Sequence, residues 1–488
     1  MRVVIVAANT FEHDSRLLRT ARALADDGHV VTLVAFAAPG LPASEELAER
    51  LSVRRVSIDR RVTSAFRPLP GGARAALARI LGFPPDATSL PPGLPRGLVD
   101  RVRAPVPRLV EIVAHQRRVG PWRDAVLGAV PDADVYHCKA LVALPVVAGA
   151  AARARAMARA GAAARTGRVE RDGGVERDGA VERVGTAARA GPPPGAEAAA
   201  PTRGRALFAY DLADLHTEAA RIARMPRPIR ALVRGREARW VRAASLRFAV
   251  SDGVAREAAR RFHVPEPVVV LNCPPAWHPE EPGPPASDRI REATGIAPGR
   301  PIVLYQGGFS VDRGIEELVG ALDEPGMRTL DPAVVLLGYG RLRERLLAEA
   351  AARPGKLFVV DAVPPGELLA WTASADIGFV GQPPRTLNQR LNLANKLFES
   401  VMAGLPVVVA EGTEHCRVTR AEGLGTCCRI EPAAIASAVA RLLGASPHER
   451  AALRSHVRSV ALERYTWERQ QRGLVEAFRS LAAETGAE

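Results

Sequence analysis

The chain has 488 residues, of which 47% are hydrophobic and 25% are charged. This is the composition of a globular protein, so it excludes a wholly disordered or collagen-like chain, and the length predicts two or three domains. The formal net charge is +14, and almost all of the basic residues are arginine, since the only lysines are Lys139, Lys356 and Lys396. Either a codon bias toward arginine or a basic surface for anionic partners explains this excess.

Cysteine spacing and hydropathy indicate the compartment in which the protein works. The absence of any CxxC pair argues against a zinc site and a disulfide framework, and favours a reducing compartment. The longest run without a formal charge, residues 28–44, is broken by prolines and is shorter than the about 20 apolar residues of a membrane span. We expect a cytoplasmic protein, soluble or at most peripheral at the inner face of the membrane. The five cysteines are Cys138, Cys273, Cys416, Cys427 and Cys428.

The first sixty residues predict a strand–helix–strand unit. Residues 3–7 form a continuous apolar run, which is typical of a strand buried on both faces. A helical pattern follows and ends at Gly28, and residues 30–36 form the next strand. Such a unit predicts a parallel sheet covered by helices. Further strands are predicted at 134–137, 206–211, 248–250 and 268–271, and helices up to Trp240 and at 252–262.

Residues 150–205 have a different character. No aromatic residue occurs between Tyr136 and Phe208, and a six-residue unit beginning Val-Glu-Arg repeats from Val169. A segment with so little apolar surface cannot offset its ordering entropy. We interpret it as a disordered insertion in the first domain that carries no catalytic residue, and we expect deletion of 156–204 to leave folding and donor binding intact.

The second half repeats the alternation of strands and helices. The proline-rich stretch 276–300 is predicted to be a linker, and a new series of elements begins at Ile302. The sequence therefore predicts an α/β protein with two doubly wound, Rossmann-like domains, 1–275 and 301–460, that face a cleft. Ligands of such sheets bind beyond the carboxyl ends of the strands. The predicted strands are 302–305, 334–337, 357–360, 377–380 and 407–410, with helices between them.

One predicted helix, at 396–403, carries two polar residues on one face. Lys396 and Glu399 lie opposite its apolar residues, so we expect neither side chain to be needed for the core. A lysine near a helix N-terminus suits a phosphate group, and a carboxylate one turn later suits a ribose diol. A plain surface ion pair is the alternative.

Two glycine-containing loops follow neighbouring strands. Gly307, Gly308 and Arg313 lie in the segment YQGGFSVDRG, and Gly338 ends the next strand. Glycine lets backbone approach a phosphate closely, and arginine supplies paired donors.

These stretches together resemble the GT-B glycosyltransferases, specifically the large retaining family 4 group. The resemblance covers nearly the whole chain except the insertion and about 55–130. It implies a GT-B architecture in which segment 461–488 returns to the first domain and the second domain binds a nucleotide-diphosphate sugar. The matching stretches include NTFEHDSRLLRTARALADDGHVVTLVAF, DVYHCKALVALP, LYQGGFSVDRGIEELVGAL, LLGYGRLRERL and LANKLFESVMAGLPVVVA.

The resemblance also implies roles for individual residues on the donor side. Arg313 and Lys396 would hold the diphosphate and act in catalysis, and Glu399 would hold the ribose. Cationic side chains and helix dipoles would stabilise the leaving diphosphate, so the resemblance implies sugar transfer with retention and without a metal or cofactor. The remaining donor-binding candidates are Gly307, Gly308, Gly338, Val363 and Ser400.

Candidates in the first domain concern the acceptor, which would be a glycan, a glycolipid or a small molecule. His137 ends a strand predicted to face the cleft and is a catalytic candidate, with a structural role as the alternative. The acceptor-side candidates are Asn9, Asp14, Arg16 and Asp211, although Asp14 is also a candidate helix N-cap. The basic region 66–123 contains an amphipathic patch, 75–83, that is either an anionic-membrane contact or an ordinary helix.

Three positions depart from the family pattern and leave other functions open. Leu391, Gly308 and Ala213 stand where many relatives have glutamate, arginine and histidine. The alternatives are an inactive GT-B homologue that acts as a binding protein, or a nucleotide-sugar epimerase. A nicotinamide-dependent enzyme is a weaker match, because Arg343 replaces the third glycine of that fingerprint. Net charge alone does not support a nucleic-acid partner.

Overall fold

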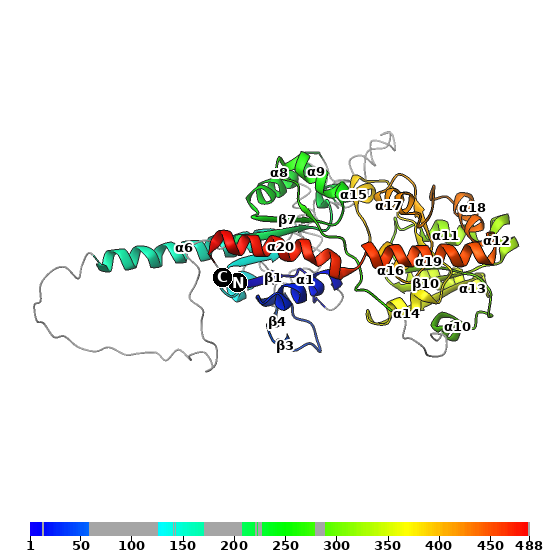
Figure 1. The fold of residues 1–488 in the computed structure, drawn as a ribbon, viewed down its shortest axis with the longest axis horizontal. Helices are drawn as coiled ribbons and strands as arrows, with labels where there is room; N and C mark the ends of the chain where they lie inside the picture. Colours follow the sequence, from blue (N-terminus) through cyan, green and yellow to red (C-terminus); the bar gives the residue numbers. More distant parts are fainter. Residues whose placement is uncertain are drawn as a thin grey trace, which may run out of the picture.

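The computed structural model describes residues 1–11, 14–57, 125–139, 141, 143–169, 207–219, 222, 227–278 and 288–486. Two α/β domains lie next to each other, each built on one sheet, and the last helix runs along the first domain (Figure 1). The predicted amphipathic patch at 75–83 and most of the predicted insertion, from residue 170 onward, lie outside the described residues.

The first domain is built on an eight-stranded sheet with the order β3-β4-β2-β1-β5-β6-β7-β8. Its strands pair in parallel except that β3 is antiparallel to β4, so the expectation of a wholly parallel sheet was wrong at this edge. Only two residues separate β3 from β4, which allows a hairpin but not the crossover that a parallel pair needs. The strands are β1 (Arg2–Val6), β2 (Val30–Phe36), β3 (Ser44–Ala48), β4 (Leu51–Val56), β5 (Val135–Cys138), β6 (Leu207–Leu212), β7 (Leu246–Ala249) and β8 (Val268–Val269).

Helices cover both faces of this sheet, which is why its strands are continuous apolar runs. One hydrophobic cluster joins the sheet to α6, α8 and α9, and a second joins the opposite face to α1 and α20. The helical elements are α1 (Ser15–Asp26), α6 (Leu144–Val169), the 3₁₀ turn η1 (His216–Glu218), α8 (Arg227–Ala243), α9 (Asp252–Phe262) and α20 (Trp467–Thr485).

Helix α6 corrects the predicted start of the insertion. The segment from residue 150 was expected to be disordered, but α6 continues to Val169, where the repeats begin. Its first turns are buried in the domain, and Figure 1 shows its outer end projecting from the body of the protein. Alanine and arginine both favour helix, so the lack of aromatic residues does not prevent helix formation here.

The second domain is built on a six-stranded parallel sheet with the order β11-β10-β9-β12-β13-β14. The predicted linker is shorter than expected, because α10 (Arg289–Thr294) buries Ile290 in this domain's core. The strands are β9 (Ile302–Gly308), β10 (Ala333–Tyr339), β11 (Leu357–Asp361), β12 (Ile377–Val380), β13 (Val407–Ala410) and β14 (Gly425–Cys428). The other helices are α11 (Ile315–Ala321), α12 (Pro325–Leu330), α13 (Arg343–Ala352), α14 (Leu368–Ala373), α15 (Leu387–Leu391), α16 (Asn395–Met402), α17 (Glu414–Glu422), α18 (Pro432–Leu443) and α19 (Pro447–Arg464).

The chain crosses between the domains twice, at neighbouring points. It leaves the first domain after β8 and returns between α19 and α20, where the backbone N–H of Trp467 donates to the carbonyl of Pro274 at 2.8 Å. Helix α20 then buries four apolar side chains against the first sheet: Trp467, Leu474, Phe478 and Leu481.

One pair of cysteines forms a disulfide, although the cysteine spacing argued against a disulfide framework. Cys416 on α17 and Cys427 on β14 are joined, with their Cα atoms 5.6 Å apart. The two elements pack against each other in three dimensions, which the absence of a CxxC pair could not reveal. Separately, no helix in the described part of the chain is long and apolar enough to cross a membrane.

Candidate functional site

A cavity of about 1100 Å³ opens between the two domains beyond the carboxyl ends of both sheets. Its first-domain wall comes from α1 and from the segments after β5 and β6. Its second-domain wall comes from the ends of β9, β10 and β11 and from the start of α16. This volume lies at the upper end of the roughly 300–1,000 Å³ of a typical small-molecule pocket.

Lys396 lies inside this cavity at the first turn of α16. Its Nζ is 3.2 Å from the Tyr305 hydroxyl and 4.3 Å from the centre of the Tyr305 ring. Burial and the nearby Arg313 lower the pKa of Lys396 to about 7. This polar face of the helix is therefore not open to solvent, because the end of β9 lies against Lys396.

Glu399 lines the same cavity one turn further along α16. Its Oε2 accepts a hydrogen bond from Gln306 Nε2 at 2.9 Å, and Gln306 Oε1 in turn accepts one from Thr372 Oγ1 at 2.7 Å. Burial raises the pKa of Glu399, and Arg19 across the cleft opposes this effect. No ion pair joins Glu399 to Lys396 in the described part of the chain, so the surface ion-pair interpretation is wrong.

Arg313 brings a second cation to this wall. Its Nη1 donates to the amide oxygen of Gln382 at 2.9 Å, and the side chain lines the cavity near Lys396. Among the described residues, neither Arg313 nor Lys396 has a carboxylate within ion-pair distance. Two cations without a carboxylate partner form a site for an anion such as a diphosphate.

Glycine is required where β9 and β10 end beside these cations. Gly307 and Gly338 are paired in register, with φ values of +116° and +154°. A Cβ at Gly338 would lie 2.0 Å from the Gly307 carbonyl oxygen, and one at Gly307 would lie 3.2 Å from Lys396 Nζ. Only glycine therefore leaves the strand ends open to a ligand. Gly308 also lines the cavity.

Of the remaining donor-side candidates, the structure places Val363 at the cavity and Ser400 away from it. Val363 lines the cavity with other apolar residues, among them Leu337 and Leu368. Ser400 is 3% exposed and donates to the carbonyl oxygen of Lys396 at 2.7 Å, away from the cavity. Its hydroxyl fills the space beside Gly378, so we correct the assignment of Ser400 from donor binding to packing between α16 and β12.

Arg16 and Asp211 form a buried pair rather than an acceptor contact. Each is 2% exposed, and Arg16 donates to both Asp211 oxygens at 2.6 and 2.8 Å. A third guanidinium N–H donates to the carbonyl oxygen of Val270 at 2.7 Å. Burial alone would raise the pKa of Asp211, but Arg16 outweighs it and the pKa is lowered. The hydrogen bonds of both charged groups therefore serve to join α1 to the sheet.

His137 is also inside the first domain rather than at the cleft. It is fully buried between Phe248 and Phe478, with ring centres 6.0 and 6.2 Å away, and within the described part of the chain neither ring nitrogen has a hydrogen-bond partner. Side chains alternate along a strand, and this one points toward α20. Burial lowers the pKa of His137 to about 4, so the ring is neutral and the assignment to catalysis is corrected.

The buried histidine predicts a pH dependence of stability. The unfolded chain protonates His137 near pH 6.5, whereas the folded protein does so only near pH 4. The unfolded state therefore binds more protons between these values, and stability is lost as pH falls from about 6.5 toward 4. We expect His137→Phe to remove up to about 1.4 kcal/mol of this loss per pH unit. Urea unfolding from pH 4 to 7 measures it, and an unchanged slope would contradict the burial argument.

Lys139 is a cleft residue that the sequence analysis missed. Its Nζ donates to both oxygens of Asp14, at 2.7 and 2.9 Å, and the side chain lines the cavity directly after β5. Asp14 also caps α1 by accepting from the Leu17 N–H, and it accepts from Asn9 Nδ2. The sequence feature that could have indicated Lys139 is the rarity of lysine in this arginine-rich chain, because two of its three lysines line this one cavity.

Other missed residues lie where the domains meet across the cavity. Asp214 Oδ1 accepts from the amides of Asn388 and Asn392, at 2.9 and 2.7 Å. Leu391, which stands in place of a glutamate of the family pattern, packs beside Gly253 of the first domain. These pairs are more than 130 residues apart in sequence, and no local pattern could have indicated them.

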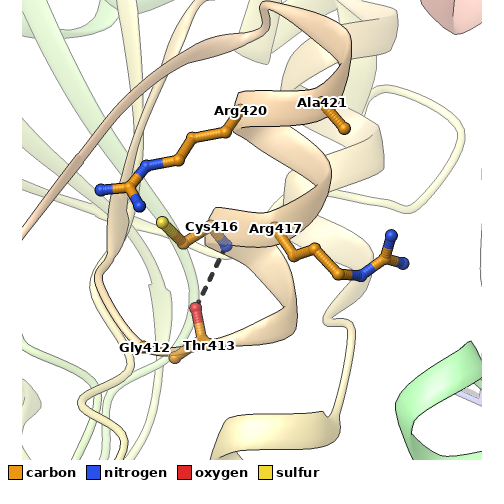
Figure 2. Close-up of a pocket in the computed structure, with 6 residues that line it drawn as sticks. All are labelled: Gly412, Thr413, Cys416, Arg417, Arg420 and Ala421. Atoms are coloured by element: carbon orange, nitrogen blue, oxygen red, sulfur yellow. Dashed lines mark hydrogen bonds between the residues drawn. The ribbon is translucent and has the colours of Figure 1, made fainter.

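A second hollow, of about 530 Å³, lies at the start of α17 and is less suited to a ligand. Figure 2 shows Arg417 and Arg420 pointing in opposite directions, with Thr413 capping the helix through the Cys416 N–H. Arg417 pairs with Glu414, and Arg420 with Glu411. The charged groups here neither converge nor lack partners, so the interdomain cavity is the candidate site.

The described chain has the GT-B fold, as predicted, and its solved structural neighbours share that fold. Sucrose-phosphate synthase from Thermosynechococcus elongatus matches 99% of this chain and 100% of its own, with a TM-score of 0.62 and 14% identity. Anabaena HepE in complex with UDP and glucose matches 98% and 100%, with a TM-score of 0.57 and 14% identity. The UDP-forming α,α-trehalose-phosphate synthase of Burkholderia vietnamiensis matches 99% of each chain, with a TM-score of 0.59 and 13% identity. Neither a scan of protein-family models nor a search of curated proteins found a match.

Proposed function

We propose that this chain is a glycosyltransferase that moves a sugar, with retention, from a nucleotide-diphosphate sugar to an acceptor without a metal ion. The observation that carries the proposal is the placement of Arg313 and Lys396 at glycine-lined strand ends and a helix N-terminus, two cations without a carboxylate partner among the described residues. Such a site suits a diphosphate. Binding of UDP by a neighbour of the same fold supports this assignment.

The other residues of the second-domain wall fit the rest of the donor. Glu399, held by Gln306, would accept hydrogen bonds from the ribose hydroxyls. The apolar segment around Val363 would receive the base, because it lines the cavity beside the end of β10. These roles are those that the resemblance to the retaining family 4 group implies, and transfer of a hexose is the reaction that we favour. A cytoplasmic role in the assembly of a glycan or glycolipid is the setting that we favour.

Transfer would proceed with the two cations stabilising the departing diphosphate. As the bond from the anomeric carbon to the diphosphate oxygen breaks, the acceptor oxygen bonds to that carbon on the same face. The acceptor proton passes to the departing diphosphate. Fixed cations aimed at the departing group stabilise its developing negative charge without having to reorganise.

The lowered pKa of Lys396 makes nucleotide binding pH-dependent. Above about pH 7 most of the unliganded protein carries a neutral Lys396, while a diphosphate favours the charged form. Binding at pH 8.5 should therefore take up close to one proton, and affinity should fall as pH rises above 7. Calorimetry of UDP and GDP in chelator, in two buffers of different ionisation enthalpy, measures this uptake.

The same titration tests the proposed donor site. Tight binding of UDP or GDP in chelator, with proton uptake that Lys396→Met removes, is the expected result. Binding that appears only when magnesium or manganese is added would overturn the proposed mechanism.

An inactive homologue that binds nucleotide sugars is a second candidate. It is favoured by Leu391, which uses the position of a family glutamate for packing between the domains. Hydrolysis or transfer of a bound nucleotide sugar would separate the enzyme from this binding protein.

A further inference from the structure

The start of α16, which carries Lys396, is not held by its own N-cap. The residue at that position is Ala394, whose methyl side chain cannot accept a hydrogen bond. The N–H groups at the start of a helix have no partner within the helix, so groups from other elements decide how such a start is held. Ala394, Asn395 and Lys396 all line the cavity, and the path of the backbone here therefore sets where the Lys396 ammonium group lies.

His415 of α17 supplies a contact to this helix start. Its Nε2 accepts a hydrogen bond from the backbone N–H of Ala394 at 2.8 Å, and its side chain is 1% exposed. Because Nε2 accepts, the proton of the neutral ring lies on Nδ1. Burial, with Lys396 and Arg313 acting in the same direction, lowers the pKa of His415 to about 3. The ring is therefore neutral near pH 7, and Nε2 keeps the lone pair that the contact needs.

Packing alone does not account for a histidine at this position. Within the described part of the chain, Nδ1 of His415 is buried without a hydrogen-bond partner. A buried donor that is left unpaired destabilises the folded state. A leucine would fill a similar volume without this cost. What the imidazole contributes is therefore the contact between Nε2 and Ala394.

The helix turn that carries His415 is itself fixed to the sheet. Thr413 caps α17 by accepting from the Cys416 N–H at 3.2 Å, and its hydroxyl donates to the carbonyl oxygen of Ala410 at 2.6 Å. Cys416 is also joined to Cys427 of β14. The first turn of α17 thus has bonds to both β13 and β14, and His415 extends from this fixed turn to the start of α16.

We propose that His415 is a positioning residue for the donor diphosphate: its hydrogen bond to Ala394 fixes the start of α16 and thereby aims the Lys396 ammonium group. The inference rests on the proposed function, which assigns the diphosphate to Lys396. His415 is buried and is not among the residues that line the cavity. It therefore acts through α16 and does not touch the substrate.

Three substitutions separate the acceptor atom from the bulk of the side chain. His415→Gln keeps an acceptor oxygen at a similar reach, His415→Asn carries the same amide on a shorter side chain, and His415→Leu removes the acceptor. Calorimetry of UDP or GDP in chelator measures the effect. The asparagine and leucine variants should each bind about tenfold more weakly or worse, because Lys396 is no longer aimed at the diphosphate. The glutamine variant should keep most of the wild-type affinity.

NMR of selectively labelled lysine measures the same displacement without a ligand, because the chain has only three lysines. Lys396→Met identifies the signal of Lys396, which should titrate near pH 7 in the wild-type protein. In His415→Leu and His415→Asn the pKa of Lys396 should rise by about one pH unit or more, since a displaced ammonium group gains solvent. In His415→Gln it should stay near 7.

Thr419→Val is the matched control on the same helix. Thr419 lies one turn beyond His415, is fully buried, and its hydroxyl also has no partner in the described part of the chain. This variant should keep the wild-type nucleotide affinity and the wild-type pKa of Lys396. Melting curves show which variants fold, and His415→Asn replaces His415→Leu if the leucine variant does not.

Two results would overturn the proposal. One is a His415→Leu or His415→Asn variant that melts early but keeps wild-type affinity and an unchanged pKa of Lys396, which would make His415 purely structural. The other is a His415→Gln variant that loses as much affinity as the leucine and asparagine variants. If the wild-type protein binds neither nucleotide, the proposed function fails, and the NMR titration alone decides whether His415 positions Lys396.

Discussion

Replacing Asp211 with alanine should destabilise the protein by about 3–5 kcal/mol, because the change leaves Arg16 charged and buried without its partner. Both side chains are 2% exposed, and Asp211 accepts two hydrogen bonds from Arg16. Urea unfolding at pH 7 measures the loss.

A surface pair of the same composition provides the control for this prediction. Arg343 and Asp361 are in contact but largely exposed. Asp361→Ala should change stability by no more than about 0.5–1 kcal/mol. Equal effects of the two substitutions would mean that the Arg16–Asp211 pair is not buried as described.

The second large effect concerns donor binding. Lys396→Met should weaken binding of the nucleoside diphosphate by about 1.5–3 kcal/mol, which is roughly 10- to 150-fold, because it removes a charged donor from a diphosphate. The same change should scarcely affect binding of the nucleoside. Glu399→Gln should weaken both ligands, since the ribose is present in both.

The chain supplies a matched control for Lys396 in Lys356, its only lysine outside the cleft. Lys356 is exposed at the end of the helix-to-strand turn before β11. Lys356→Met should leave nucleotide affinity unchanged. If Lys396→Met binds nucleoside diphosphate normally, or if both variants lose affinity equally, the donor site is misassigned.

The elements that could be predicted are those with strong local patterns. The apolar runs of β1, β9 and β13 and the amphipathic α16 were located within a few residues, because burial on both faces or on one face imposes a period on the sequence. The glycines at the ends of β9 and β10 were also recognisable, because glycine at a strand end lets backbone approach a ligand, and the structure shows that a Cβ would not fit at Gly338. The order of these elements predicted the two-domain fold.

The functions of individual first-domain residues could not be predicted in the same way. Arg16 and Asp211 are 195 residues apart in sequence, and Lys139 and Asp14 are 125 residues apart. Only the folded structure therefore shows which residues form these ion pairs. His137 lies on β5 and is buried in the core. Lys139, only two residues later and just beyond the end of the strand, lines the cleft. A residue near a strand end could be predicted to lie close to the site. The oppositely charged residue that it would pair with could not be predicted.

The most direct test of glycosyl transfer is the release of nucleoside diphosphate from a panel of nucleotide sugars, measured by mass spectrometry in chelator. Sugars are included as acceptors. The wild-type protein should release nucleoside diphosphate from at least one donor well above the protein-free background, and an Arg313→Met, Lys396→Met double variant should not. Absence of release from every donor, or release that the double variant retains, would contradict the assignment of this cleft to sugar transfer.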